Sequence, residues 1–383
     1  MTESIIDSAK DWSEKLPLWS RQFEEERRLH ETIAKEFSQA GFFRMLVPQV
    51  YGGLQVHPLE FIEVLKLIAM GDGSAAWNVM IGATTGLLSA SLPEQGAREI
   101  YASDAQVLSV GVTAPAGRAD RIEGGYRVTG RWPFGSGCQN AQWISGGCFV
   151  YEHGESAMDT KNQAEVRLMI FSADQVNIEN TWDVVGLRGT GSHHFSVKDV
   201  FVPDRRTVLI GGRANISEPL YQFPLLGLLA LGVASVALGI GFRALDEFSQ
   251  LAVTKQPTGA SRKLAERGAV QASVARSLAD LRSAEAFMKE AVNNAWDYAE
   301  QGDPLDAALK SALRLAAANG THSAVAAVDR LYDAAGGSAI YMDSPLQQCF
   351  RDVHVVTQHI MVANPIYEVV GRVHLGLPAR SML

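Results

Sequence analysis

The sequence predicts an α+β protein in which a middle β-domain separates an N-terminal helical domain from a C-terminal four-helix bundle. Apolar residues recur at three- and four-residue spacing in about the first hundred residues and again in the last third of the chain, which is typical of packed helices. Between these parts, short segments rich in β-branched residues alternate with Gly, Asp and Asn, which is typical of strands and turns. We place the domains at residues 1–106, 107–215 and 216–383.

The N-terminal domain shows helical spacing over residues 20–46, which ends close to the turn sequence Tyr-Gly-Gly at 51–53. Residues 57–88 carry the same spacing, but Gly71 and Gly73 interrupt it. Because glycine weakens a helix interior, we expect two helices here rather than one.

The middle domain is expected to consist of short strands. Five segments have the composition of strands, at residues 107–115, 120–132, 142–150, 165–171 and 193–203. The second of them contains Glu-Gly-Gly-Tyr at 123–126, which favours a hairpin turn. Strands that are grouped in this way, rather than interleaved with helices, argue against an all-parallel sheet.

The C-terminal domain contains an uncharged run at residues 219–242 that is long enough to cross a lipid bilayer. The run continues without a break into a segment with the charge spacing of an amphipathic helix, and no second run of this kind follows. We therefore expect a helix buried at the centre of the bundle, where Gly and Ala let neighbouring helices approach closely. Residues 268–301, with a wide Ala and Leu stripe, predict another long helix of the bundle.

Composition argues against several classes of protein. A formal net charge of -8 disfavours nucleic acid as the main partner, because phosphate binding needs a basic surface. Cys138, Cys148 and Cys349 are scattered and odd in number, so we expect neither a disulfide framework nor a thiolate metal site. The first residues lack a basic start followed by an apolar run, so no secretory signal is expected. Together these features predict a cytoplasmic protein with no membrane span.

Three local motifs are weak signals of chemistry. Residues 239–244 mimic a Gly-x-Gly-x-x-Ala dinucleotide fingerprint, but the preceding run is too long and too rich in Ala and Leu to be the strand that this motif requires. His193 and His194 are adjacent in a predicted strand and point to opposite faces, so we expect no metal site. Ser136 lies in Gly-Ser-Gly at a strand end rather than in the Gly-x-Ser-x-Gly elbow of hydrolases, which disfavours a nucleophilic role.

Two longer stretches carry a family resemblance. Residues 182–203, WDVVGLRGTGSHHFSVKDVFVP, and residues 331–352, LYDAAGGSAIYMDSPLQQCFRD, resemble the two hallmark stretches of the acyl-CoA dehydrogenase superfamily. The order of helical, β and helical parts agrees with that superfamily over essentially the full length. The resemblance implies an acyl-CoA dehydrogenase-like fold that encloses a flavin, and a homotetramer.

The chain departs from the dehydrogenases where they carry their base. Dehydrogenases need a carboxylate to remove a proton from the acyl thioester, yet residues 219–242 contain no Asp or Glu. His359 and Ile360 stand where Tyr and Glu are expected. The Trp-x-Phe-x-Ser-Gly motif at residues 132–137 and His359 instead resemble the two-component flavin-dependent monooxygenases, such as 4-hydroxyphenylacetate hydroxylase, secosteroid phenol hydroxylase and dibenzothiophene monooxygenase.

This resemblance implies roles for particular residues. Ser136 and His359 would be catalytic, with the Ser136 hydroxyl beside the reactive edge of the isoalloxazine. His359 would either donate a hydrogen bond to a flavin peroxide or deprotonate a phenol. Backbone amides near Val112 and Thr113 would meet the pyrimidine edge, and Gly336 and Gly337 would lie near the cofactor tail of a neighbouring subunit. The implied flavin-contacting set is Val112, Thr113, Trp132, Phe134, Ser136, Gly137, Trp182, Thr190, Ser192, Gly336 and Gly337.

The implied function is that of the oxygenase component of a two-component monooxygenase. It would use reduced FMN or FAD and molecular oxygen to hydroxylate an aromatic or other small hydrophobic substrate through a flavin C4a-hydroperoxide. Residues 253–261 replace the Arg-x-x-Phe-Gly that grips the FAD diphosphate in dehydrogenases, so FMN is as plausible as FAD. Reduced flavin would come from a separate NAD(P)H-dependent flavin reductase.

Two alternatives remain open. One is an acyl-CoA dehydrogenase-like or nitroalkane-oxidising flavoenzyme that uses a base not recognised in the sequence. The other is a flavin-free descendant that serves only as an assembly partner.

Overall fold

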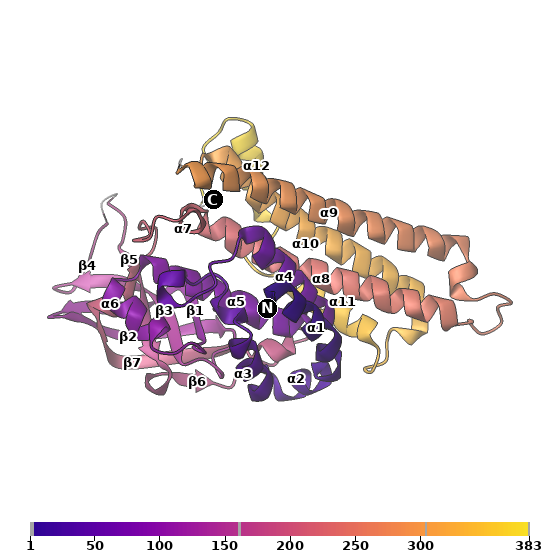
Figure 1. Ribbon diagram of the computed structural model, residues 1–383, viewed down its shortest axis with the longest axis horizontal. Coiled ribbons are helices and arrows are strands. Elements are labelled where there is room, and N and C mark those ends of the chain that lie inside the picture. Colours follow the sequence, from indigo (N-terminus) through magenta and orange to yellow (C-terminus); the bar gives the residue numbers. More distant parts are fainter. Residues whose placement is uncertain (1–3, 160–161, 303–304, 382–383) are drawn as a thin grey trace.

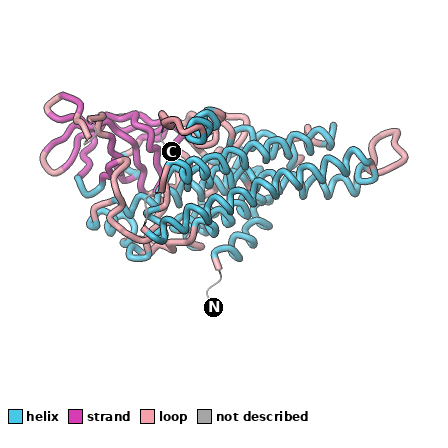
Figure 2. Tube along the Cα trace, turned by 90° about the horizontal axis from the view of Figure 1, so that it is seen from above, coloured by secondary structure: helices cyan, strands magenta, loops and turns pink. Residues whose placement is uncertain are grey.

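The computed structural model describes residues 4–159, 162–302 and 305–381. The first three and last two residues of the predicted terminal domains therefore lie outside the described residues. A twisted sheet forms one end of the molecule, long helices extend from the other, and the N-terminal helices pack between them (Figures 1 and 2). This arrangement is the helical, β and helical order predicted from the sequence.

The N-terminal part is helical up to residue 102. Its α-helices are α1 (Ile5–Lys15), α2 (Ser20–Glu26), α3 (Glu31–Gln39), α4 (Pro58–Gly71), α5 (Gly73–Leu87) and α6 (Glu94–Ala97). The expected break between Gly71 and Gly73 is present, and the side chain of Asp72 caps α5 by accepting from the Ala75 N–H at 2.9 Å. Helical spacing over residues 20–46 is divided at Arg27, which ends α2 with a left-handed φ of 52°. The periodic pattern contains no signal for that break.

The middle part is one mixed sheet. Its strands are β1 (Ser109–Ile122), β2 (Gly125–Gly135), β3 (Trp143–Glu152), β4 (Glu155–Ser156), β5 (Val166–Ser172), β6 (Asn177–Glu179), β7 (His193–Pro203) and β8 (Thr207–Leu209). The order is β6-β7-β2-β1-β3-β5-β8, with β4 paired to β3. The predicted hairpin joins β1 to β2, so the segment expected at 120–132 is divided between these two strands. β1 also holds most of the segment expected at 107–115, and it is irregular between Val112 and Gly117.

The C-terminal part is helical from Pro219. Its α-helices are α7 (Pro219–Gln222), α8 (Leu225–Thr254), α9 (Gly268–Gln301), α10 (Ala307–Ala335), α11 (Pro345–Val356) and α12 (Pro365–His374). By length and composition α8 is the one helix among the described residues that could span a membrane, and 78% of its most apolar window is buried inside the protein. It packs against α4, α5, α10 and α11, and a Cβ at Gly239 would lie 2.4 Å from the Lys66 carbonyl. The predicted buried helix is therefore confirmed, and residues 239–244 lie within it rather than after a strand.

Candidate functional site

Ser136 sits in a short connection directly after β2, and its side chain is only 5% exposed. The glycines on both sides are required by close packing. A Cβ at Gly135 would lie 2.7 Å from the Phe195 ring, and one at Gly137, whose φ is +74°, would lie 2.8 Å from Asn78 Oδ1. The Gly137 N–H also donates to the Thr190 carbonyl at 3.0 Å. Gly-Ser-Gly thus lets the end of β2 bring one hydroxyl against the N-terminal helices and the loop before β7.

Three buried hydroxyls form a continuous hydroxyl chain, Ser136–Ser192–Thr190. Ser136 Oγ lies 2.6 Å from Ser192 Oγ, which lies 2.7 Å from Thr190 Oγ1. Thr190 donates its only hydroxyl proton to the Leu187 carbonyl at 2.8 Å, so it accepts from Ser192, and Ser192 in turn accepts from Ser136. Ser136 Oγ also accepts from Trp77 Nε1 at 3.1 Å. Ser136 therefore keeps a free lone pair but no free proton, which makes it an acceptor toward a ligand.

His359 lies in the turn after α11, and its ring meets the Trp77 indole edge to face, with centroids 5.5 Å apart. The Met361 N–H donates to His359 Nδ1 at 3.3 Å, while the Met361 carbonyl accepts from the Arg314 guanidinium at 3.2 Å. A neutral imidazole carries one proton, so this contact assigns that proton to Nε2. His359 is consequently a donor through Nε2.

The surroundings of His359 disfavour its protonation. Burial, with the Arg314 guanidinium as a second cause, lowers the pKa of His359 to about 4. Part of the ring remains exposed to solvent. At neutral pH the imidazole is neutral.

Phe134, which is exposed, and Trp182, which is half-buried, form an aromatic pair beside the hydroxyl chain. Phe134 is 64% exposed although its φ is 64°, a left-handed conformation that a bulky residue seldom adopts. The Trp182 ring lies edge to face with it at 6.3 Å, and Trp182 Nε1 donates to the Leu187 carbonyl at 3.2 Å. An aromatic ring that is held in a strained conformation and left exposed is suited to stack on a flat ligand.

The remaining predicted residues lie apart from this cluster. Trp132 is fully buried in the sheet, where it stacks on Phe195 at 5.1 Å and donates to the Gly147 carbonyl at 2.7 Å. Val112 and Thr113 lie on the irregular part of β1, where Thr113 is exposed. Gly336 and Gly337 follow α10, and in the described part of the chain neither makes a hydrogen bond to the hydroxyl chain.

The residues present fit a flavin and do not resemble a dehydrogenase site. The site offers an acceptor hydroxyl, a neutral imidazole and the aromatic pair of Phe134 and Trp182, and together these groups can hold a planar polar ring. Over the described ranges, no Asp or Glu hydrogen-bonds to the hydroxyl chain, Trp77 or His359. These contacts place no carboxylate on the hydroxyl chain, and the lack of a dehydrogenase base stays a prediction from the sequence.

Sequence patterns did not single out two parts of the site. Helical spacing does not distinguish Trp77 from a packing residue, because its contact with Ser136 spans 59 positions in the chain. Asp352 belongs to a family hallmark stretch, but its partner, the Leu187 N–H, is 165 positions away. No local pattern reports either contact.

Comparison with known proteins finds relatives over nearly the full length of the chain. An acyl-CoA dehydrogenase N-terminal domain model matches residues 2–102, and an acyl-CoA dehydrogenase C-terminal domain model matches residues 231–364. The chain is 33% identical to an indole-3-acetate monooxygenase of Pseudomonas putida over 98% of this chain and 93% of that protein. It is 28% identical to the oxygenase component of a FADH(2)-dependent resorcinol hydroxylase of Rhizobium sp., over 94% of this chain and 91% of that protein. The structure of XiaF from Streptomyces sp. in complex with FADH2 and glycerol shares the fold, with a TM-score of 0.91, 24% identity and coverage of 99% and 96%.

The chain belongs to the acyl-CoA dehydrogenase family, within its branch of flavin-dependent monooxygenases. It is the oxygenase component of a reduced-flavin-dependent system, and a separate reductase component supplies the reduced flavin. Relatives of this fold have been solved with FADH2 or with FMN.

Proposed function

We propose that the chain hydroxylates an aromatic substrate that lies close to Trp77 and His359. The observation that carries this proposal is the contact between the Trp77 indole and the His359 ring, next to the hydroxyl chain. An aromatic substrate can pack against the indole while a ring substituent meets the imidazole. The similarity to an indole-3-acetate monooxygenase supports this substrate class.

When bound, reduced flavin would supply the chemistry, which is the activation of the molecular oxygen from which the transferred atom comes. The protein holds and orients the reactants. Phe134 and Trp182 provide a face for the flavin ring, and Ser136 accepts a hydrogen bond through its free lone pair. The buried surroundings of Ser136 keep bulk water away from the reacting atoms.

His359 acts as a hydrogen-bond donor rather than as a base. Its Nδ1 accepts from the Met361 N–H, so Nε2 carries the proton of the neutral ring. Removing a phenol proton at Nε2 would require the other tautomer, which would place an N–H against the Met361 N–H. The low pKa of His359 also makes the ring a weak base. The imidazole therefore donates to an oxygen of the bound reactants.

The finer description of the partners is also part of the proposal. The reductase would be NAD(P)H-dependent and would interact transiently, delivering reduced FMN or FAD by diffusion. A homotetramer is supported by the exposed apolar residues Ile340, Tyr341 and Met342, which follow Gly337 and need a covering surface. Light scattering measures this oligomeric state. The scattered cysteines, all three free and buried, support a cytoplasmic location.

Anaerobic titration tests the flavin part, and product analysis tests the substrate part. The purified protein should bind reduced FMN or FAD more tightly than the oxidised form, and should hydroxylate indole-3-acetate or resorcinol when a reductase and NADH are present. Failure to bind reduced flavin would contradict the proposal. So would anaerobic bleaching of a bound oxidised flavin by an acyl thioester or a nitroalkane, which the alternative flavoenzyme activities predict.

A further inference from the structure

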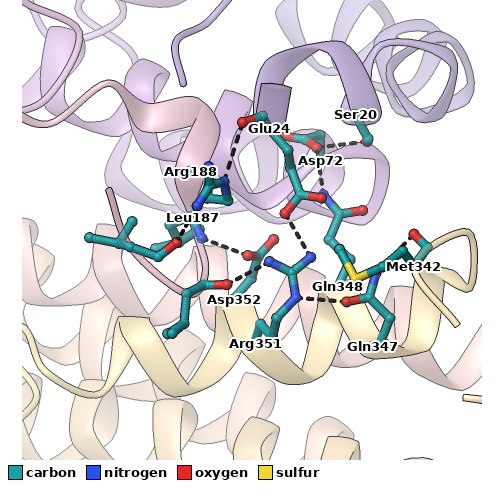
Figure 3. Close-up of polar contacts among 12 residues, drawn as sticks. Ser20, Glu24, Asp72, Leu187, Arg188, Met342, Gln347, Gln348, Arg351 and Asp352 are labelled. Carbon is teal, nitrogen blue, oxygen red and sulfur yellow. Dashed lines mark hydrogen bonds and ion pairs between the residues drawn. The ribbon is translucent and has the colours of Figure 1, made fainter. Parts of the chain in front are cut away.

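Two buried carboxylates lie behind the site and do not touch it. Asp72 lies between α4 and α5 and is 0% exposed, and Asp352 lies in α11 and is 2% exposed. Figure 3 shows that the side chains around them come from the N-terminal helices, the loop before β7 and α11. A buried carboxylate is costly unless hydrogen bonds satisfy it, so the contacts of each indicate what it holds in place.

Asp72 holds the start of α5. Its Oδ1 accepts from the Ala75 N–H, and its Oδ2 accepts from Ser20 Oγ at 2.7 Å and from Gln348 Nε2 at 3.3 Å. Trp77 lies in the second turn of this helix. The contact with Gln348 therefore fixes α5, and with it Trp77, relative to α11.

Asp352 holds the loop before β7 at Leu187. Its Oδ1 accepts from the Leu187 N–H at 2.6 Å. The Leu187 carbonyl in turn accepts from the Thr190 hydroxyl at 2.8 Å, the Thr190 N–H at 3.1 Å and the Trp182 indole at 3.2 Å. The backbone of one residue, Leu187, thus connects Asp352 to both the hydroxyl chain and the aromatic pair.

The Leu187 turn needs an external anchor. Leu187 has φ 49° and ψ 36°, a left-handed conformation that is unfavourable for a leucine. Its side chain is buried, and its N–H faces the carboxylate rather than water. Arg351 supports the same loop by donating to the Val185 carbonyl at 2.5 Å while pairing with Glu24 of α2 at 2.7 Å. Two consecutive residues of α11 therefore clamp the loop.

We propose that Asp352 is a positioning residue of the flavin site. It holds Thr190 and Trp182 in their binding arrangement through the backbone N–H and carbonyl of Leu187. Because this inference rests on the proposed function, the wild-type protein must bind flavin for it to be tested. The carboxylate acts as a hydrogen-bond acceptor, and its charge is not required. The contact between Asp72 and Gln348 connects α11 also to α5, the helix that carries Trp77.

Flavin titration with Asp352→Ala and Asp352→Asn tests the proposal. The alanine variant leaves the Leu187 N–H without an acceptor, and we expect its Kd for reduced flavin to rise at least tenfold. The asparagine variant keeps an acceptor oxygen, and we expect its Kd to stay within twofold of the wild type. Thr321→Val is the matched control, since Thr321 is buried and donates only to Ala317 within α10.

The outcomes separate positioning from general stability. A lower Tm for Asp352→Ala with an unchanged flavin Kd would overturn the proposal, because a merely structural residue behaves in that way. An equal loss of affinity in Asp352→Asn would also overturn it, since charge and not acceptance would then matter. If the wild type itself binds no flavin, the proposed function fails instead.

Hydrogen exchange of the wild type provides a second test that needs no variant. Peptides covering residues 186–192 should be protected before flavin is added, because the Leu187 and Thr190 amides are already bonded. Exchange as rapid as that of an exposed loop would overturn the proposal even if the alanine variant does not fold.

Discussion

Replacing Ser136 by alanine should damage both the fold and the flavin site. The substitution removes the acceptor of the buried Trp77 N–H and the donor to Ser192, which lie 3.1 and 2.6 Å away. An unsatisfied buried donor costs about 1–3 kcal/mol, so we expect the free energy of unfolding to fall by that amount. Loss of the hydrogen bond that we propose Ser136 accepts from the flavin should weaken reduced-flavin binding about fivefold to tenfold, equivalent to ~1–1.4 kcal/mol.

Three measurements on Ser136→Ala check these values. Urea unfolding gives the stability, anaerobic titration gives the flavin Kd, and the hydrogen peroxide released per reduced flavin gives the coupling to product. We expect more peroxide and less hydroxylated product, because the bound reactants are held less firmly. Ser235→Ala is the matched control, since Ser235 is equally buried but donates only to the Leu231 carbonyl within α8.

A double-mutant cycle with Ser192→Ala tests the hydroxyl chain itself. Directly bonded residues should show a coupling energy of about 0.5–3 kcal/mol, whereas independent residues would be additive. If Ser136→Ala binds reduced flavin as tightly as the wild type and forms as much product per reduced flavin, the assignment of this hydroxyl to the flavin is refuted.

Substitutions at three other positions, His359, Asp352 and Phe134, test other parts of the site. His359→Gln keeps an N–H donor and should retain more hydroxylation activity than His359→Phe in steady-state assays, whereas equal losses would indicate a base. For Asp352, burial, followed by the charges of Asp72 and Glu24, raises the pKa to about 7, against hydrogen bonding by the Leu187 N–H and the charge of Arg351. The Asp352 carboxyl ionises near pH 4 in the unfolded state and near pH 7 in the folded state. The free energy of unfolding of the wild type should therefore fall as the pH rises from 4 to 7. Asp352→Asn should therefore gain Tm relative to the wild type between pH 4 and 7, and a constant difference would contradict this. Phe134→Gly should relieve a strained φ yet weaken flavin binding about threefold or more, as measured by titration.

The sequence predicted the architecture because the relevant signals are local. A long uncharged run with small residues at its contact positions, continuing into an amphipathic segment, predicted a buried helix, and α8 is packed on several sides. Two glycines around one aspartate separated α4 from α5, since Asp is a strong helix cap. The missing carboxylate could also be seen directly in residues 219–242.

Some local features were outside the reach of such signals. Arg27 divides the helical spacing of residues 20–46 with a left-handed residue, although arginine has no preference for that conformation. Trp132 shares its motif with Phe134, yet one side chain is buried in the sheet and the other is exposed. Residues two apart in a regular strand point to the same face, but the positive φ of Phe134 breaks the strand geometry, so the two side chains differ in burial.

By itself, the amino-acid order determined the three-part fold, the buried α8 and the break between α4 and α5, because periodicity and glycine act over a few neighbouring residues. Tertiary structure alone decided that Ser136 meets Trp77 and Ser192, that His359 lies against Trp77, and that Asp352 holds Leu187. The Ser136–Ser192 contact joins two segments of the middle domain, and each of the others joins segments from different domains. A hydrogen bond acts over about 3 Å, so its partners are specified only after packing has brought the segments together.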